Sequence, residues 1–124
     1  MLRVAVFLIW SIILVAPAAS AADRQGRWHT AWRVSQALLA GADAADAASS
    51  WGKGEGNPLV RAGPRFSYGS LAIKLGALTG GLVAQHYILR NAPEQTALLA
   101  SANLAGAAML GVVAVHNLHV AAPK

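Results

Sequence analysis

The chain contains no cysteine, and charged residues make up only 12% of its 124 residues. Without cysteine, neither a disulfide framework nor a thiolate metal site can form. Charged residues are about half as frequent as the roughly 25% of an average globular protein, while hydrophobic residues reach 56%. A chain of this length forms one domain, so the shortage of charge indicates contact with lipid rather than a large water-soluble core.

Acidic residues are scarce as well, with five Asp and Glu against ten Lys and Arg and a formal net charge of +5. Such an excess can indicate nucleic-acid binding. Here the cations are spread over the ends and connections of the chain, and they lack the interleaved aromatic residues of a base-stacking surface. We therefore expect no nucleic-acid partner, and we interpret the basic residues as anchors at the lipid headgroups.

The first 21 residues have the features of a secretory signal peptide. Arg3 precedes an apolar run over residues 4–16, Pro17 ends that run, and Ala19-Ser20-Ala21 supplies the small side chains needed for cleavage. The alternative is an uncleaved anchor, but the run is shorter than the ~17 residues that a membrane span needs. Cleavage would leave a single domain, residues 22–124, that begins outside the cytoplasm.

Two strongly apolar segments, residues 70–89 and 96–120, are predicted to be transmembrane helices. At a rise of ~1.5 Å per residue each can cross a hydrocarbon layer of ~30 Å. Lys74 is the only permanently charged residue within them. The connection between the two segments is short, so the helices are expected to form an antiparallel hairpin, with the lipid bilayer as their surroundings.

An Ala-rich third helix is predicted over residues 28–50, before a Gly- and Pro-rich loop over residues 51–69. Its Asp43 and Asp46 each cost about 2.5 to 3.5 kcal/mol in the middle of a membrane helix. Two arrangements stay open: the helix spans beside a partner charge, or it lies on the membrane surface. Trp28 and Trp32 are expected at the membrane interface. The predicted fold class is all-α, a membrane bundle of three helices.

Polar residues are expected to gather at one membrane depth. If the three helices alternate in direction, the end of the first, the start of the second and the end of the third lie on one side. The residues that this places together are Asp43, Asp46, Lys74, His116 and Asn117, with Glu55 and Asn57 covering them from the loop. A second polar layer near the other side would hold Ser35, Gln36, Gln85, His86 and Asn103.

Two interpretations of the first layer compete. In the structural one, Lys74 neutralises Asp43 or Asp46 and fixes the order of the helices. In the functional one, carboxylates and imidazoles form a proton relay, a cation site or a metal-assisted hydrolase centre. The sequence has no H-E-x-x-H motif and no G-x-S-x-G turn. We therefore expect no metal and no cofactor, and nothing in the motifs identifies an enzyme.

Small residues at a spacing of four are expected to hold membrane helices close together. Gly76, Gly80 and Ala84 form one such row, and Ala102 and Gly106 form another. Close packing within the predicted hairpin explains both rows. Dimerisation of two copies through Gly76 and Gly80 is the alternative.

Three short motifs extend these expectations: Asp43-x-x-Asp46, Glu55-Gly56-Asn57-Pro58-Leu59, and Ile73-Lys74-Leu75-Gly76. Over residues 38–119 the chain resembles a group of short, uncharacterised bacterial membrane proteins with a domain of unknown function. The resemblance implies that the acidic pair, the loop motif and the lysine belong together.

We expect a protein of the bacterial inner membrane with a structural or accessory role. It would act through helix packing with itself or within a larger membrane complex. The alternative is a small transport or intramembrane enzymatic protein that uses the polar cluster.

Overall fold

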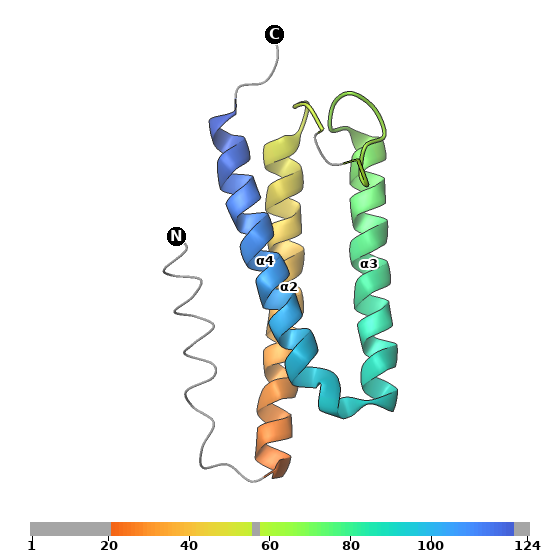
Figure 1. Cartoon of the computed structure of the whole chain (residues 1–124), viewed down its shortest axis with the longest axis vertical. Helices are drawn as coiled ribbons and strands as arrows, with labels where there is room; N and C mark the ends of the chain where they lie inside the picture. Colours follow the sequence, from red (N-terminus) through yellow and green to blue (C-terminus); the bar gives the residue numbers. More distant parts are fainter. Residues whose placement is uncertain (1–20, 56–57, 121–124) are drawn as a thin grey trace.

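The computed structural model describes residues 21–55 and 58–120, which form three long helices and one short one (Figure 1). They are α2 (Ala21–Ser50), α3 (Tyr68–Asn91), the 3₁₀ turn η1 (Pro93–Gln95) and α4 (Thr96–His119). The described residues contain no strand beyond an isolated bridge between Gly54 and Arg65. The all-helical class is therefore confirmed for them. The predicted signal peptide up to residue 20, and Asn57, lie outside the described residues.

Helix α2 covers Ala21–Ser50, so it includes the residues 21–27 that precede the expected start at residue 28. Asp23 lies in its first turn, where a carboxylate interacts favourably with the positive end of the helix dipole. The helix ends at Ser50, as expected, and Gly52 then adopts a φ of +70° that residues with side chains rarely take. The 30-residue helix is longer than α3 or α4, each of 24 residues.

The boundaries of α3 and α4 lie close to the expected ranges. Arg90 occupies the last turn of α3, where its charge interacts favourably with the helix dipole. Pro93 then stands at the first position of η1, where its missing N–H and fixed φ are tolerated. The chain reverses within this short connection, and α4 follows immediately.

The helices alternate in direction, so α2 and α4 run parallel while α3 runs antiparallel to both (Figure 1). By far the closest packing is between α2 and α4, and α3 makes few close backbone approaches to either. The prediction that small residues pack α3 tightly against α4 is therefore wrong. The chemistry explains this: α3 reaches its neighbours through the long side chains of Lys74 and Gln85, whereas small residues let α2 and α4 approach.

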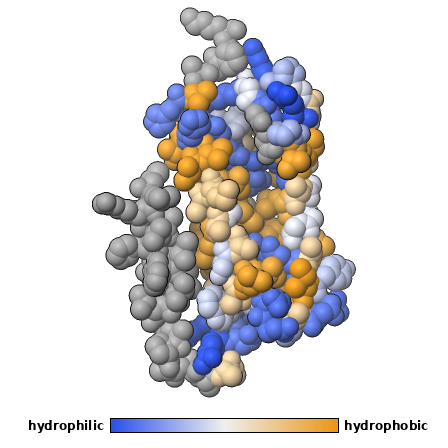
Figure 2. Space-filling view, viewed as in Figure 1, coloured by the Kyte–Doolittle hydropathy of each residue, from blue (hydrophilic) through white to orange (hydrophobic). Residues whose placement is uncertain are grey.

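The distribution of polarity is the reverse of that in a water-soluble bundle. Among the described residues, six polar side chains are buried, and three of the five buried hydrophobic residues are alanines. Many large apolar side chains are exposed along the helices, among them Val34, Leu75, Val83, Met109 and Val112. Figure 2 shows hydrophilic residues gathered towards the two ends and mostly apolar ones between. The interior of this bundle is held together by polar contacts.

Among the described helices, only the segment Pro93–His119 is both long and apolar enough to cross a membrane. Helix α3 has sufficient length, but Lys74, Gln85 and His86 lower its average hydropathy. The sequence predicts two membrane-spanning segments, residues 70–89 and 96–120. By length and composition, only the second of these is identified among the described helices.

Candidate functional site

An ion-paired group joins α2 to α3 near one end of the bundle. The carboxylates of Asp43 and Asp46 project from the inward face of α2, where both residues are more than nine-tenths buried. Lys74, on the second turn of α3, extends between them. Its Nζ lies 2.5 Å from Asp46 Oδ2 and 3.2 Å from Asp43 Oδ1. The spacing of three residues places both acids on one helix face, so one ammonium group can reach both.

The third helix joins the same group through Asn117. Its Nδ2 donates hydrogen bonds to Asp46 Oδ1 at 3.0 Å and to Ser50 Oγ at 2.8 Å. Asp46 therefore accepts from α3 with one carboxylate oxygen and from α4 with the other. We call Asp43, Asp46, Ser50, Lys74 and Asn117 the charged cluster. It connects all three long helices.

A second cation reaches the edge of this cluster from the loop. The Nζ of Lys53 donates to the backbone carbonyl oxygen of Asn117, in the last turn of α4. The same carbonyl oxygen accepts a hydrogen bond from the Val120 N–H at 3.2 Å, and a lysine at the end of a helix interacts favourably with the helix dipole. The ion pairs with Lys74 supply the counter-charge that a buried acidic pair requires in surroundings of low dielectric constant.

His116 and Glu55 are also predicted for this layer. His116 is exposed, because neighbouring residues on an α-helix point about 100° apart and Asn117 occupies the inward position. Glu55 lies in the loop, where its backbone N–H donates to Pro64 O at 3.4 Å. Asn57 is outside the described residues. The predicted layer thus contains the two aspartates, the lysine and the asparagine, without the histidine.

Nearer the middle of the bundle lies a second group, the amide network of Trp32, Ser35, Gln85 and Asn103. Gln85 and Asn103 exchange two hydrogen bonds, from Gln85 Nε2 to Asn103 Oδ1 at 2.7 Å and from Asn103 Nδ2 to Gln85 Oε1 at 2.9 Å. Asn103 Nδ2 also donates to Ser35 Oγ at 3.1 Å. This network again joins α2, α3 and α4.

Trp32 is the member that the sequence interpretation missed. Its Nε1 donates to Gln85 Oε1 at 2.9 Å, and the residue is only 6% exposed, so it is not an interfacial anchor. The signal was present in the sequence, because Trp32 shares the helix face of Ser35, Asp43 and Asp46. Gln36 is half-buried and His86 is exposed, and no pattern in the sequence separates these two residues from the members of the network.

A third contact closes the other end of the bundle. Gln25, in the second turn of α2, donates from Nε2 to Pro93 O at 2.8 Å and to Thr96 Oγ1 at 3.2 Å. Thr96 is buried and donates in turn to Pro93 O at 2.5 Å. Polar contacts therefore fix α2 against its neighbours at three levels along its length.

The small residues divide into two groups. A Cβ added at Gly76 or Gly80 would meet no heavy atom within 4 Å, and Ala84 is exposed. A Cβ added at Gly106 would lie 3.2 Å from Leu39 Cδ1, so this glycine permits the close approach of α4 to α2. Ala102 is exposed. Of the five residues proposed for helix packing, only Gly106 lies at the close contact between α2 and α4.

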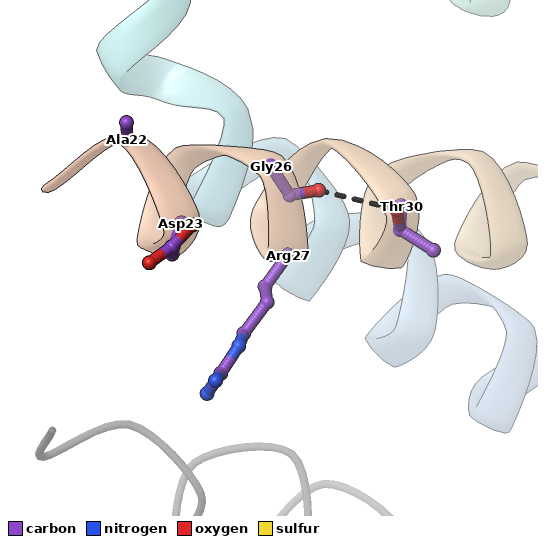
Figure 3. A pocket seen from close by; sticks show the side chains of 5 residues that line it. All are labelled: Ala22, Asp23, Gly26, Arg27 and Thr30. Atoms are coloured by element: carbon purple, nitrogen blue, oxygen red, sulfur yellow. Dashed lines mark hydrogen bonds between the residues drawn. The ribbon is translucent and has the colours of Figure 1, made fainter. Parts of the chain in front are cut away.

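A shallow, open depression lies along the first turns of α2, lined by Ala22, Asp23, Gly26, Arg27 and Thr30 (Figure 3). There Thr30 Oγ1 donates to Gly26 O at 3.1 Å, and the Arg27 side chain extends away from the helix. Within residues 21–55 and 58–120, no three His, Cys, Asp or Glu side chains are grouped to hold a metal ion.

No family model, curated protein or solved structure matches this chain. The resemblance based on the three sequence motifs therefore stays a prediction.

Proposed function

We propose that the protein is an integral membrane protein with a structural or accessory role, in which the charged cluster and the amide network lock three membrane-embedded helices into one arrangement. The observation that supports this most strongly is the reversed polarity of the bundle. Ser35, Asp43, Asp46, Thr96 and Asn103 are buried, while Val34, Leu75, Val83 and Met109 are among the exposed side chains.

In water this arrangement would be unfavourable. Each large exposed side chain forgoes about 1.5 to 3 kcal/mol of burial, and the interior offers little apolar area in return. In lipid the balance changes, because hydrocarbon surrounds the outer side chains and unpaired polar groups are costly. The interior contacts then become the specific attraction between helices.

Under this proposal α2 spans the membrane together with α3 and α4. Its two aspartates oppose insertion of the isolated helix. The ion pairs with Lys74 and the hydrogen bond from Asn117 compensate that cost once the helices have assembled. Within the described part of the chain, Lys74 likewise forms its ion pairs with α2 alone. The proposal therefore makes α2 and α3 mutually dependent in the membrane of the bacterial cell.

The engagement of the polar groups favours a structural role over transport or enzymatic chemistry. The Lys74 ammonium contacts both carboxylates, and both oxygens of Asp46 accept hydrogen bonds. His116, the imidazole predicted for this layer, is exposed. Because the charged groups of the cluster are paired with one another, the cluster is better suited to holding helices together than to binding a ligand.

The experiment is alkaline carbonate extraction of membranes that contain the full chain, compared with the Lys74→Met variant. The proposal expects the native chain to stay in the membrane pellet and the variant to show reduced abundance there. Release of the native chain into the supernatant would contradict the proposal. So would normal abundance of the variant combined with loss of a cellular phenotype, because that result favours chemistry at the cluster.

A further inference from the structure

We propose that the segment closing the charged end of the bundle binds the headgroup phosphate of an anionic phospholipid through Arg61 and Arg65. This closing segment comprises residues 51–55 and 58–68. The inference rests on the proposed membrane location and specifies which lipid is recognised and where.

The closing segment is an ordered structure that holds its side chains in place. Gly52 N–H donates to Phe66 O at 3.1 Å, and Phe66 N–H donates to Lys53 O at 2.8 Å. The Phe66 side chain is 2% exposed and anchors the segment to the bundle. Lys53 adds its contact with the end of α4. The two parts of the closing segment are therefore hydrogen-bonded to each other, and the segment contacts the ends of two helices.

An aromatic pair on this segment indicates its depth. The rings of Trp51 and Tyr68 meet edge to face with centroids 4.8 Å apart, and the two residues are 44% and 78% exposed. Leu59 is 83% exposed on the same segment. Trp and Tyr favour the boundary between hydrocarbon and headgroups, where one side of the ring is apolar and the other polar. The closing segment then lies at the level of the lipid phosphates.

The charge of the segment supplies the selectivity. Arg61 and Arg65 are exposed, and within the described part of the chain neither makes an ion pair or a side-chain hydrogen bond. Lys53, by contrast, is engaged with Asn117. A guanidinium group can donate two parallel hydrogen bonds to phosphate oxygens. Anionic lipids are preferred because a zwitterionic headgroup carries a compensating ammonium group.

The test uses the full-length protein in vesicles of equal amounts of phosphatidylglycerol and phosphatidylcholine. One lipid at a time carries a photoactivatable group near the headgroup, and mass spectrometry measures the cross-link yield on peptides of the closing segment. We expect a higher yield with phosphatidylglycerol. Replacing Arg61→Gln and Arg65→Gln should lower that preference by about fivefold per arginine. Equal yields from both lipids in the native protein would overturn the inference.

The matched control is Arg33→Gln with Arg90→Gln, two exposed arginines outside the closing segment. We expect this control to leave the preference at the closing segment unchanged. An equal loss in control and test variants would overturn the inference, because it would show a response to net charge alone. Carbonate extraction separates the two proposals: a native chain that leaves the membrane contradicts the proposed function, and one that stays without lipid preference contradicts only this inference.

Discussion

Lys74 and Asp46, 28 residues apart in the sequence, form an ion pair of 2.5 Å between two helices whose backbones make few close approaches. The long lysine side chain bridges that distance. The position of α3 therefore depends on a small number of polar contacts rather than on a continuous packed interface.

Removing the lysine alone should be strongly destabilising. Lys74→Met leaves Asp43 and Asp46 buried without their common counter-charge, and breaking a buried pair from one side costs about 3 to 5 kcal/mol. The triple variant Asp43→Asn, Asp46→Asn, Lys74→Met removes all three charges. We expect it to recover most of the lost stability, measured by denaturant unfolding in detergent. A triple variant less stable than Lys74→Met would contradict the account.

The amide network should contribute less, because its groups are neutral. Trp32→Phe keeps the aromatic ring and removes the indole N–H that donates to Gln85. Hydrogen bonds between membrane helices average about 0.6 kcal/mol, with a maximum of about 1.7. We expect a loss of stability in this range in the same unfolding experiment.

Asn103→Ala should cost more than Trp32→Phe, because Asn103 bonds to both Gln85 and Ser35. Ser101→Ala is the matched control: Ser101 is exposed on the same helix and donates only to the carbonyl of Ala97. Equal losses for Asn103→Ala and Ser101→Ala would show that the network has no special weight.

The two kinds of glycine should respond in opposite ways. Gly80→Ala places a methyl group in open space, and alanine favours a helix by about 1 kcal/mol over glycine, so stability should be unchanged or raised. Gly106→Leu introduces a side chain where even a Cβ lies 3.2 Å from Leu39, so α2 and α4 should separate and stability should fall. Thermal unfolding of the purified variants measures both. A stabilising Gly106→Leu would contradict the α2–α4 contact.

Much of the helical framework could be predicted from the sequence. Apolar length located α3 and α4, and the Gly- and Pro-rich segment after Ser50 located the end of α2. The meeting of Asp43, Asp46, Lys74 and Asn117 followed from depth, since alternating helices place known residues at a common level.

The helix face that a residue occupies is harder to predict than its depth along the bundle. His116 and Asn117 share a level, but only one can point inwards, and residue type alone does not decide which. The frequency of tryptophan at membrane interfaces predicts an interfacial Trp32, whereas the helix face that Trp32 shares with Asp43 and Asp46 lies in the interior. A short connection brings the ends of α3 and α4 together, but it does not determine which helix faces pack, and α4 packs mainly against α2. Helices α3 and α4 are joined through the long side chain of Gln85, and the spacing of residues in the sequence does not show how far such a side chain extends.

The most direct test of the account exploits the absence of native cysteine. Val112→Cys on α4 and Leu75→Cys on α3 place single thiols at positions that are 53% and 49% exposed in the structure. Gly54→Cys in the closing segment is the exposed control. Each full-length variant is treated with a water-soluble maleimide in permeabilised membranes, and then again after denaturation.

A thiol that is exposed on the surface of the bundle but covered by lipid is then distinguished from a thiol that is exposed to water. If lipid surrounds the helices, the thiols at positions 112 and 75 react only after denaturation, whereas the thiol at position 54 reacts in the membrane. Rapid labelling at all three positions before denaturation would place α3 and α4 in water and contradict the central claim that this polar-cored bundle is embedded in a membrane.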